Sequence, residues 1–479
     1  MPGNRANVYD RKVTPIERSL SLSPFSIVTM VARVRGDVSG RMLADAVSRV
    51  QQRHPLLRAR IAEDSDHDLW FTSEGAGEIP IEVVPRESEE HWVQVFHEAC
   101  QVPFEFDARP AIRFILVQSP AVSELIILCH HIICDGLSLA YLAKDLMIHL
   151  GDPEREVEVL PDPVPLDKGS MPQNVSVGRI ARFFIKRINK QWAQSRVFFD
   201  QEDYRALCEA YWRNYTHRML PIELSETQTS ALVERCRQEQ VTVNTALTAA
   251  FVGAQVLVQG DRPYHTSIGI AGSVRNRVRE PVGEGMGFYA GVVTCKCGYD
   301  VKTSFWENAR QFHRKITPRY TNKVLFQDLL TWCYLDSAIL EALNFKRLGG
   351  LVSPDSPRYD KLSAFGEQDD VILALLKREK MDSLDRIVMG TAVTNLTRMD
   401  FPRTYGPLEL DRLIMNPGGA FPLSNVGLVL GAVTCSGKLS LVVEYAEQAV
   451  DTTTMQKIAD KAMTLLLGQQ GRARDERPD

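Results

Sequence analysis

The sequence predicts a mixed α/β fold in which two halves of similar make-up follow one another along the chain. Apolar runs of strand length and segments with apolar residues at helical spacing occur in both halves. Their order is too irregular for a doubly wound parallel sheet, in which strands and helices alternate. The 479 residues are 44% hydrophobic and 24% charged, which is typical of a globular protein with about two or three domains. We therefore expect an α/β (α+β) protein.

The first half carries clear signals for where its elements begin and end. Residues 25–34 form an apolar run typical of a strand, and a turn is expected at Gly36. Residues 39–53 keep apolar side chains at helical spacing. Pro55 ends this helix because proline disfavours the α conformation in the residue before it. Further strands are predicted over 56–61, 69–72, 79–84, 112–118 and 124–129, and further helices over 87–102 and 136–150.

A proline-rich stretch after Gly151 separates the two halves. We expect an N-terminal half over 1–175, a basic helical crossover over 176–215 and a C-terminal half over 216–479. In the last of these, Ser225 is a good N-cap for a helix through 239, and Asn244 opens an apolar helix through 258. The remaining elements are predicted strands over 266–270, 291–295, 385–395, 420–429 and 438–445, helices over 304–316, 324–343 and 453–467, and a frayed charged tail over 469–479.

Composition and charge exclude several classes of protein. A formal charge of −4 argues against a general nucleic-acid binder. The nine cysteines lack metal-type spacing, and Cys295 and Cys297 stand one residue short of a CxxC motif, so reduced thiols and no metal site are expected. Residues 1–18 lack the apolar core of a signal peptide, and no run reaches about 18 uncharged apolar residues. The sequence therefore favours a cytoplasmic protein without a membrane span.

The segment over 125–136 carries the residues suited to chemistry. An apolar strand runs directly into His130 and His131, and a helix begins just after Asp135 and Gly136. Strand ends that meet helix starts present reactive groups in α/β proteins. An imidazole held there can act as a general base if its neighbours fix its tautomer, and Asp135 is the nearest acidic residue. Gly136 would let a ligand or another strand approach the backbone closely.

These residues alone leave three interpretations open. In the first interpretation, Asp135 is only the N-cap of the following helix, and both histidines are packing residues. Alternatively, His131 and Asp135, with or without His130, bind a metal ion, although a third and fourth ligand at short spacing are missing. In the third interpretation they form an acid–base site.

Four segments together resemble one protein superfamily. HHxxxDG at 130–136 is similar to the signature of HxxxD acyltransferases, and RHPLLRARI at 53–61 is similar to the RHxxLRxxF motif of condensation domains. Residues 274–293 resemble the VGMFVNT region, and 394–397 with 405–408 resemble the later SNxG and YGP region. On this basis the chain is identified as a member of the superfamily of chloramphenicol acetyltransferase, nonribosomal-peptide condensation domains, BAHD acyltransferases and polyketide-associated acyltransferases.

The resemblance implies two chloramphenicol-acetyltransferase-like half-domains with an active-site tunnel between them. It implies that His131 lies midway along the tunnel and takes the proton from the acceptor. His130 and Gly136 would support the loop. Asp135 would be held by a salt bridge to Arg58, with Arg60 as the second choice.

The resemblance also gives Asn395 two possible roles. It would contact the substrate or the oxyanion, or it would be a structural asparagine in a turn.

The activity implied by the resemblance is acyl transfer from a thioester. The donor would be acyl-CoA or an acyl carrier protein with its phosphopantetheine arm, the acceptor a hydroxyl, and the product an ester in secondary metabolite or lipid biosynthesis. The plant-type DFGWG motif is absent, and no adenylation, carrier or thioesterase segment is attached, so a stand-alone monomer without a permanently bound cofactor is expected. The alternatives are a free-standing condensation enzyme that forms an amide with an amine acceptor, and a non-catalytic scaffold.

A basic segment over 177–196 contains six arginines and lysines and no acidic residue. Its apolar side chains Ile180, Phe184, Ile188 and Trp192 fall at helical spacing. The simplest interpretation is a helix with a core-facing stripe and a solvated basic back. Two others remain open: docking of an acidic acyl carrier protein, and peripheral contact with a membrane.

Overall fold

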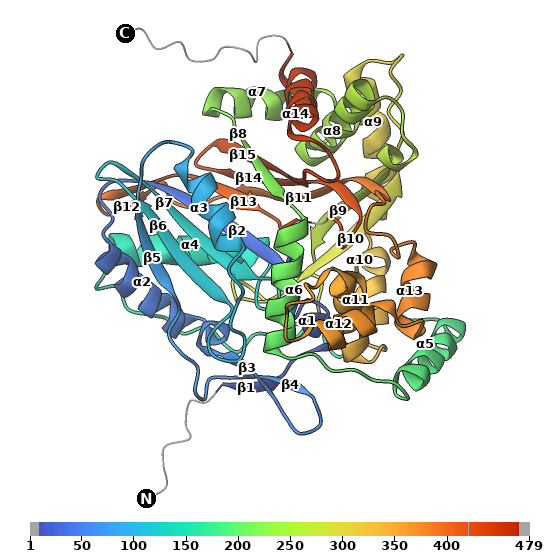
Figure 1. Ribbon diagram of the computed structural model, residues 1–479. Coiled ribbons are helices and arrows are strands. Elements are labelled where there is room, and N and C mark those ends of the chain that lie inside the picture. Colours follow the sequence, from blue (N-terminus) through green and yellow to red (C-terminus); the bar gives the residue numbers. More distant parts are fainter. Residues whose placement is uncertain (1–8, 420, 469–479) are drawn as a thin grey trace, which may run out of the picture.

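The computed structural model describes residues 9–419 and 421–468, which form two six-stranded sheets and one small sheet surrounded by helices (Figure 1). The small sheet has the order β1-β4-β3 and lies below the first large sheet in the view of Figure 1. Its strands are β1 (Asp10–Lys12), β3 (Arg60–Glu63) and β4 (Leu69–Thr72), with the short helix α1 (Pro15–Arg18) following β1. The predicted tail over 469–479 lies outside the described residues.

The N-terminal sheet has the strand order β12-β13-β2-β7-β6-β5. Helix α4 packs on β2 and β13, and α2 packs on α4. The strands are β2 (Ile27–Arg35), β5 (Ile81–Pro85), β6 (Ile112–Gln118), β7 (Val122–His130), β12 (Thr404–Tyr405) and β13 (Leu408–Asn416). The helices of this half are α2 (Gly40–Arg53), α3 (His91–Cys100), α4 (Gly136–Gly151) and α6 (Gln201–Asn214).

The C-terminal sheet has the order β10-β9-β11-β14-β15-β8. Helix α8 packs against α7, α9 and α14 in the helical layer at the top of Figure 1. The strands are β8 (His217–Glu223), β9 (Ser267–Ser273), β10 (Ala290–Lys296), β11 (Met389–Met399), β14 (Val426–Cys435) and β15 (Lys438–Ala446). The helices are α7 (Glu226–Gln238), α8 (Val243–Gln259), α9 (Phe305–Ile316), α10 (Asn322–Trp332), α11 (Ser337–Leu348), α12 (Tyr359–Glu367), α13 (Val371–Glu379) and α14 (Thr452–Leu467), and α5 (Arg179–Trp192) lies in the crossover.

The predicted mixed α/β class is therefore confirmed, and the helices predicted over 39–53 and 225–239 begin at side-chain N-caps. The Ser39 hydroxyl accepts from the Met42 N–H at the start of α2, and Ser225 forms a capping box with Gln228 at the start of α7. Helix α8 differs slightly, because its N-cap is Thr242 rather than Asn244. No single helix in the described ranges is long and apolar enough to cross a membrane, although α7 and α8, bent by 96°, pass that test as a pair.

Some predicted elements differ from the structure. The segment after His54 is a 3₁₀ helix (Pro55–Arg58) before β3, since Pro55 starts a helical turn that buries Leu56 and Leu57. The long helix predicted over 324–343 is two helices, because the Asp336 side chain accepts the Ala338 N–H and starts α11. Strand β14 begins at Val426 rather than at 420. The elements that the sequence analysis did not predict are strands β1, β8, β12 and β13 and helices α1, α6, α12 and α13.

Strand β13 crosses from the C-terminal part of the chain into the N-terminal sheet. It pairs antiparallel with β2 from Glu409 opposite Arg35 to Asn416 opposite Thr29. The predicted boundary at residue 216 therefore does not separate the sheets, since part of 216–479 completes the sheet of the other half. Apolar burial explains this exchange, because Leu410 and Leu413 are fully buried in a core cluster that includes both sheets.

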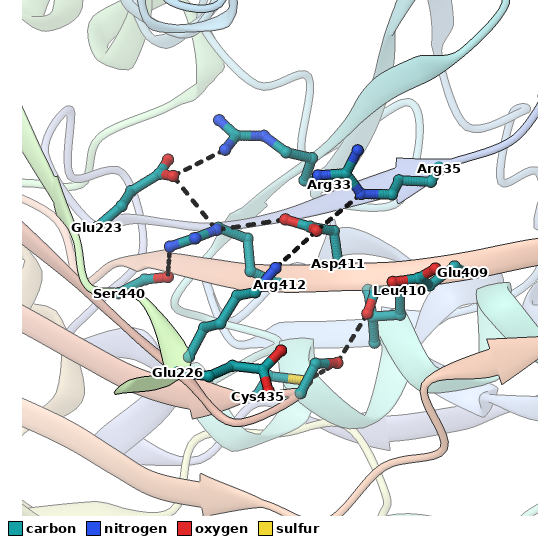
Figure 2. A network of polar contacts seen from close by, with 12 residues as sticks. Arg33, Arg35, Glu223, Glu226, Glu409, Leu410, Asp411, Arg412, Cys435 and Ser440 are labelled. Atoms are coloured by element: carbon teal, nitrogen blue, oxygen red, sulfur yellow. Dashed lines mark hydrogen bonds and ion pairs between the residues drawn. The ribbon is translucent and has the colours of Figure 1, made fainter. Parts of the chain in front are cut away.

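A polar network joins the two sheets at this crossing (Figure 2). Arg33 of β2 and Arg412 of β13 both bind the Glu223 carboxylate of β8, at 2.8 and 3.2 Å. Beside them, Asp411 accepts from Arg35 at 2.9 Å and from Lys438 at 2.8 Å. Burial alone would raise the pKa of Asp411, but these two cations lower it to about 2. Charged side chains thus fix the register of β13 between the sheets.

Candidate active site

The candidate site is the turn between β7 and α4. Strand β7 lies inside the N-terminal sheet between β2 and β6, and it ends at His130. The His131 N–H donates to the Ser26 carbonyl at 2.8 Å, which holds the chain after the strand. Asp135 has extended backbone angles and caps α4, its side chain accepting the Ser138 N–H at 2.7 Å. The two histidines are therefore fixed by a rigid strand on one side and a capped helix on the other.

His130 is fully buried and points into the protein interior. Its Nε2–H donates to the Ser23 carbonyl at 3.1 Å, and its Nδ1 accepts from the Ile132 N–H at 3.3 Å. The rings of Phe104 and Phe106 lie edge-on to it at 5.8 and 4.9 Å. Burial lowers the pKa of His130 to about 3, so the ring stays neutral at ordinary pH. His130 therefore packs behind the turn, and its role in supporting the loop stays a prediction.

The neutral state of His130 should make the protein sensitive to acid. Between pH 6.5 and about 3 the unfolded chain binds a proton that the folded chain does not, so stability falls as the pH is lowered through this window. In His130→Gln this contribution is absent, so the free energy of unfolding should change less steeply with pH, by up to about 1.4 kcal/mol per pH unit. Urea unfolding of both proteins across this range measures the difference, and parallel profiles would contradict the assignment.

His131 is half-buried and holds its ring in one tautomer. Its Nδ1–H donates to the Cys134 carbonyl at 3.0 Å, so Nε2 carries the lone pair. No hydrogen bond joins Nε2 to another residue in the described part of the chain. Phe288 lies edge-on to the ring, with centroids 5.3 Å apart. Burial lowers the pKa of His131, although the Cys134 carbonyl and the Asp135 charge oppose this effect. The ring is thus a neutral base near pH 7.

Asp135 is paired with Arg275 and not with Arg58, so the predicted salt bridge was wrong. The Arg275 Nη2 lies 2.8 Å from Asp135 Oδ1, and both side chains are almost fully buried. The other carboxylate oxygen accepts the Tyr289 N–H at 3.1 Å. Burial alone would raise the pKa of Asp135, but Arg275 and the Ser138 donors hold it below its usual value. Asp135 is therefore both the N-cap of α4 and the charged contact between the two halves.

The RHPLLR segment contacts helix α4 at a point away from the site turn. Arg53 and His54 both contact the Asp145 carboxylate of α4, with Nε and Nε2 at 2.8 and 2.9 Å from Oδ2. Arg58 is half-buried at the end of the 3₁₀ helix, and it forms no ion pair with an acidic residue in the described ranges. Arg60 donates to backbone carbonyls of Glu74 and Asp107. The motif therefore anchors helix α4 through Asp145, a residue that the sequence analysis missed.

Gly136 allows a close approach of the C-terminal half, as predicted. A Cβ atom at this position would lie 2.9 Å from the Leu396 Cδ2 of β11. A larger side chain would therefore push against Leu396 where the end of β11 meets the start of α4.

A cavity of about 1130 Å³ opens beside this contact. The start of α4 forms one end of it, and its walls come from the C-terminal half. The ring of His131 is not part of its wall, so the cavity reaches the α4 end of the site and not the imidazole itself. Its lining includes Asp135, Gly136 and Leu137 of the site turn, Thr229, Val233 and Arg237 of α7, Asn244 and Thr245 of α8, Ala271 to Ser273 of β9, and Thr394 to Arg398 of β11.

Asn395 lies in the wall of this cavity at a bulge of β11. Its Oδ1 accepts the Thr397 N–H at 2.7 Å, and Thr397 has a left-handed backbone with φ +64. The pairing of β11 with β14 shifts register between Asn395 and Arg398. The structural role of a turn asparagine is therefore present, at a position that also faces the cavity.

Metal chemistry finds no support in the described residues. No group of three or more His, Cys, Asp or Glu side chains there is arranged to hold a metal ion. The nine cysteines are free thiols and buried, and the Sγ atoms of Cys295 and Cys297 lie 3.6 Å apart. Burial raises the pKa of most of these thiols, including Cys208 to about 12 and Cys333 to about 11, so they are protonated near neutral pH.

Part of the chain is similar to a known protein family. Residues 16–155 match the family model of the condensation domain. A stretch of 128 residues, 26% of this chain, is 32% identical to the nonribosomal peptide synthetase agiA of Aspergillus flavus, and the match covers 2% of that synthetase. The chain therefore spans only a small part of the curated relative.

Solved structures extend the likeness to the whole fold. The trichothecene 15-O-acetyltransferase TRI3 from Fusarium sporotrichioides matches with a TM-score of 0.62 and 13% identity over 97% of both chains. The epimerization domain from the third module of tyrocidine synthetase B matches with a TM-score of 0.58 and 13% identity over 96% of both chains. The fold is thus the chloramphenicol-acetyltransferase-like fold of these proteins. Residues 16–155, which include HHxxxDG, match the condensation-domain model, and the chain as a whole has the fold of these proteins.

Proposed function

We propose that the protein is an acyltransferase that moves an acyl group from a thioester donor to a hydroxyl acceptor. The observation that carries this proposal is the tautomer of His131. Because Nδ1–H is bound to the Cys134 carbonyl, Nε2 is the atom that accepts a proton. The lowered pKa keeps it unprotonated near neutral pH, as a general base requires.

The chemistry needs little more than this base and correct positioning. Nε2 takes the proton from the acceptor hydroxyl while the oxygen attacks the thioester carbonyl. The C–S bond then breaks, and the imidazolium returns the proton to the leaving thiolate. The products are an ester and a free thiol. No covalent acyl-enzyme is required when both substrates meet in one site, because holding them together replaces a bimolecular encounter.

The start of α4 offers donors for the negative charge that develops on the carbonyl oxygen. Gly136 and Leu137 are the first two residues of the helix, and both line the cavity. In the described part of the chain their backbone N–H groups have no acceptor, as expected at a helix N-terminus. We assign them to the oxyanion, since such preorganised donors stabilise acyl-transfer transition states.

The cavity provides a path for one substrate to the N-terminus of α4, beside the site turn. We propose that it accepts the pantetheine arm of coenzyme A or of an acyl carrier protein, with no permanently bound cofactor. Hydroxyl acylation is preferred because TRI3, which has the same fold, is named as an O-acetyltransferase.

Amide formation with an amine acceptor is the second candidate. It is favoured by the match of residues 16–155 to the condensation domain and of one segment to a nonribosomal peptide synthetase.

Thiol release from acyl-CoA and acyl-carrier donors of several chain lengths tests the proposal, with alcohol and amine acceptors added in turn. Alcohol-stimulated release with an ester product, abolished in His131→Ala and unaffected by chelator, supports it. Release stimulated only by amines, with an amide product, supports the second candidate. A wild-type protein that releases no thiol from any donor contradicts catalysis and favours a scaffold role.

A further inference from the structure

Helix α5 (Arg179–Trp192) projects from the edge of the molecule at the lower right of Figure 1. One side of it is anchored. Ile185 is buried in the core cluster around α10, and Trp192 is fully buried at the end of the helix. The Asn189 side chain donates to the Tyr334 carbonyl at 3.0 Å and accepts the Asp336 N–H at 3.0 Å. The helix therefore has a fixed orientation and a defined outer face.

The outer face carries large apolar side chains that nothing covers in the described structure. Ile180, Phe183 and Phe184 are 77%, 66% and 50% exposed. The predicted core-facing stripe is therefore wrong for Ile180 and Phe184, whereas Ile188 packs against the core and Trp192 is fully buried. The other large hydrophobic side chains that are similarly exposed in the described structure are valines and one leucine, scattered over separate parts of the fold. Scattered apolar residues are normal on protein surfaces, whereas a cluster that includes two phenylalanines marks a binding surface.

The same helix carries a concentrated positive charge. Its cations Arg179, Arg182, Lys186, Arg187 and Lys190 are all exposed, and no acidic residue lies between 179 and 192. None of the five forms an ion pair with a carboxylate in the described ranges, and Arg182 instead lies over the Tyr334 ring at 5.0 Å. The chain as a whole is negative, at −4, so this local charge is uncompensated.

We propose that α5 binds the surface of an anionic membrane, with Ile180, Phe183 and Phe184 inserted at the level of the acyl chains and the cations among the headgroup phosphates. A helix with an apolar face and many arginines and lysines lies in the plane of such an interface. An acidic protein surface would neutralise the cations, but it would need a matching apolar pocket for three side chains on a convex helix. A lipid interface accommodates both the cations and the apolar side chains without a pocket of matching shape. This proposal is independent of the proposed catalytic function.

Co-sedimentation of the full chain with vesicles tests the proposal. We expect binding to vesicles of phosphatidylcholine mixed with phosphatidylserine, weaker binding at high salt, and little binding to phosphatidylcholine alone. Lys186→Glu with Arg187→Glu should weaken binding to the anionic vesicles by about tenfold or more. Phe183→Ser with Phe184→Ser should weaken it without any change in charge, and both side chains are exposed enough for the fold to survive.

A matched charge reversal controls for net charge. Lys457→Glu with Lys461→Glu alters two exposed lysines of α14, at the opposite end of the molecule in Figure 1, and should leave vesicle binding unchanged. The proposal is overturned if the wild-type protein does not bind anionic vesicles, or if the α5 and α14 variants lose binding equally. It is also overturned if the α5 charge reversal leaves vesicle binding intact and raises KM only for a carrier-bound donor, which would identify an acidic carrier protein as the partner.

Discussion

Arg275→Ala is expected to destabilise the folded protein by about 3–5 kcal/mol, because it leaves the buried Asp135 carboxylate without its counter-ion. Both side chains are nearly inaccessible to solvent, so the carboxylate is poorly hydrated and depends on the guanidinium. Arg275 also donates to the carbonyls of Gly283 and Gly285, at 3.1 and 2.8 Å, so the loop before β10 loses support as well. Urea unfolding at neutral pH measures the loss.

The pH dependence of this loss distinguishes a charge effect from a packing effect. The pKa of Asp135 is lowered in the folded protein, so its pairing contributes stability above the unfolded value of about 3.9 and loses it as the pH falls through the folded pKa. The difference between wild type and Arg275→Ala should therefore shrink in acid. The double variant Arg275→Met with Asp135→Asn should recover part of the stability, because it removes both charges. A double variant less stable than Arg275→Ala would contradict the account.

His131→Ala is expected to lower kcat for acyl transfer by about 10²–10⁴-fold with little change in KM, since a general base acts in the transition state. In the wild-type protein, kcat/KM should fall as the pH decreases through the pKa of His131. Because burial lowers that pKa, the fall should begin below the value of about 6.5 that is usual for histidine. Steady-state kinetics from acid to neutral pH measure both effects.

A second histidine variant separates loss of the base from loss of any imidazole. His91→Ala removes a partly exposed histidine at the start of α3, away from the site turn, and should keep the wild-type kcat and melting temperature. If His131→Ala retains wild-type kcat with a donor and acceptor that the protein uses, His131 is not the base.

The sequence was sufficient to predict the fold class and the position of the site turn, because local signals determine both. The apolar run before His130, the N-cap at Asp135 and the glycine after it lie within a few residues of one another. The structure confirms that the strand ends at His130 and that the helix starts at Gly136. The helices predicted over 39–53, 225–239 and 304–316 likewise agree with α2, α7 and α9 to within a residue or two.

The partners of these residues could not be predicted in the same way, because they come from distant parts of the chain. The sequence analysis named Arg58 as the partner of Asp135, and only the packing of the C-terminal half places Arg275 against it. A local signal existed for Asp145, which is the only acidic residue of α4 and lies on a buried position of an apolar helix. A buried carboxylate at this position needs a charged or hydrogen-bonding partner, and Arg53 and His54 supply it.

The exchange of β13 between the sheets has a consequence for biosynthesis. During translation β2 emerges long before β13, by an interval on the order of tens of seconds. Throughout that interval one edge of β2 has no partner strand, and an open apolar edge is a template for association with other chains. The nascent N-terminal sheet therefore cannot be completed until residue 416 has left the ribosome. Expression yield should depend on chaperones that hold this edge, and on the speed with which the ribosome reaches β13.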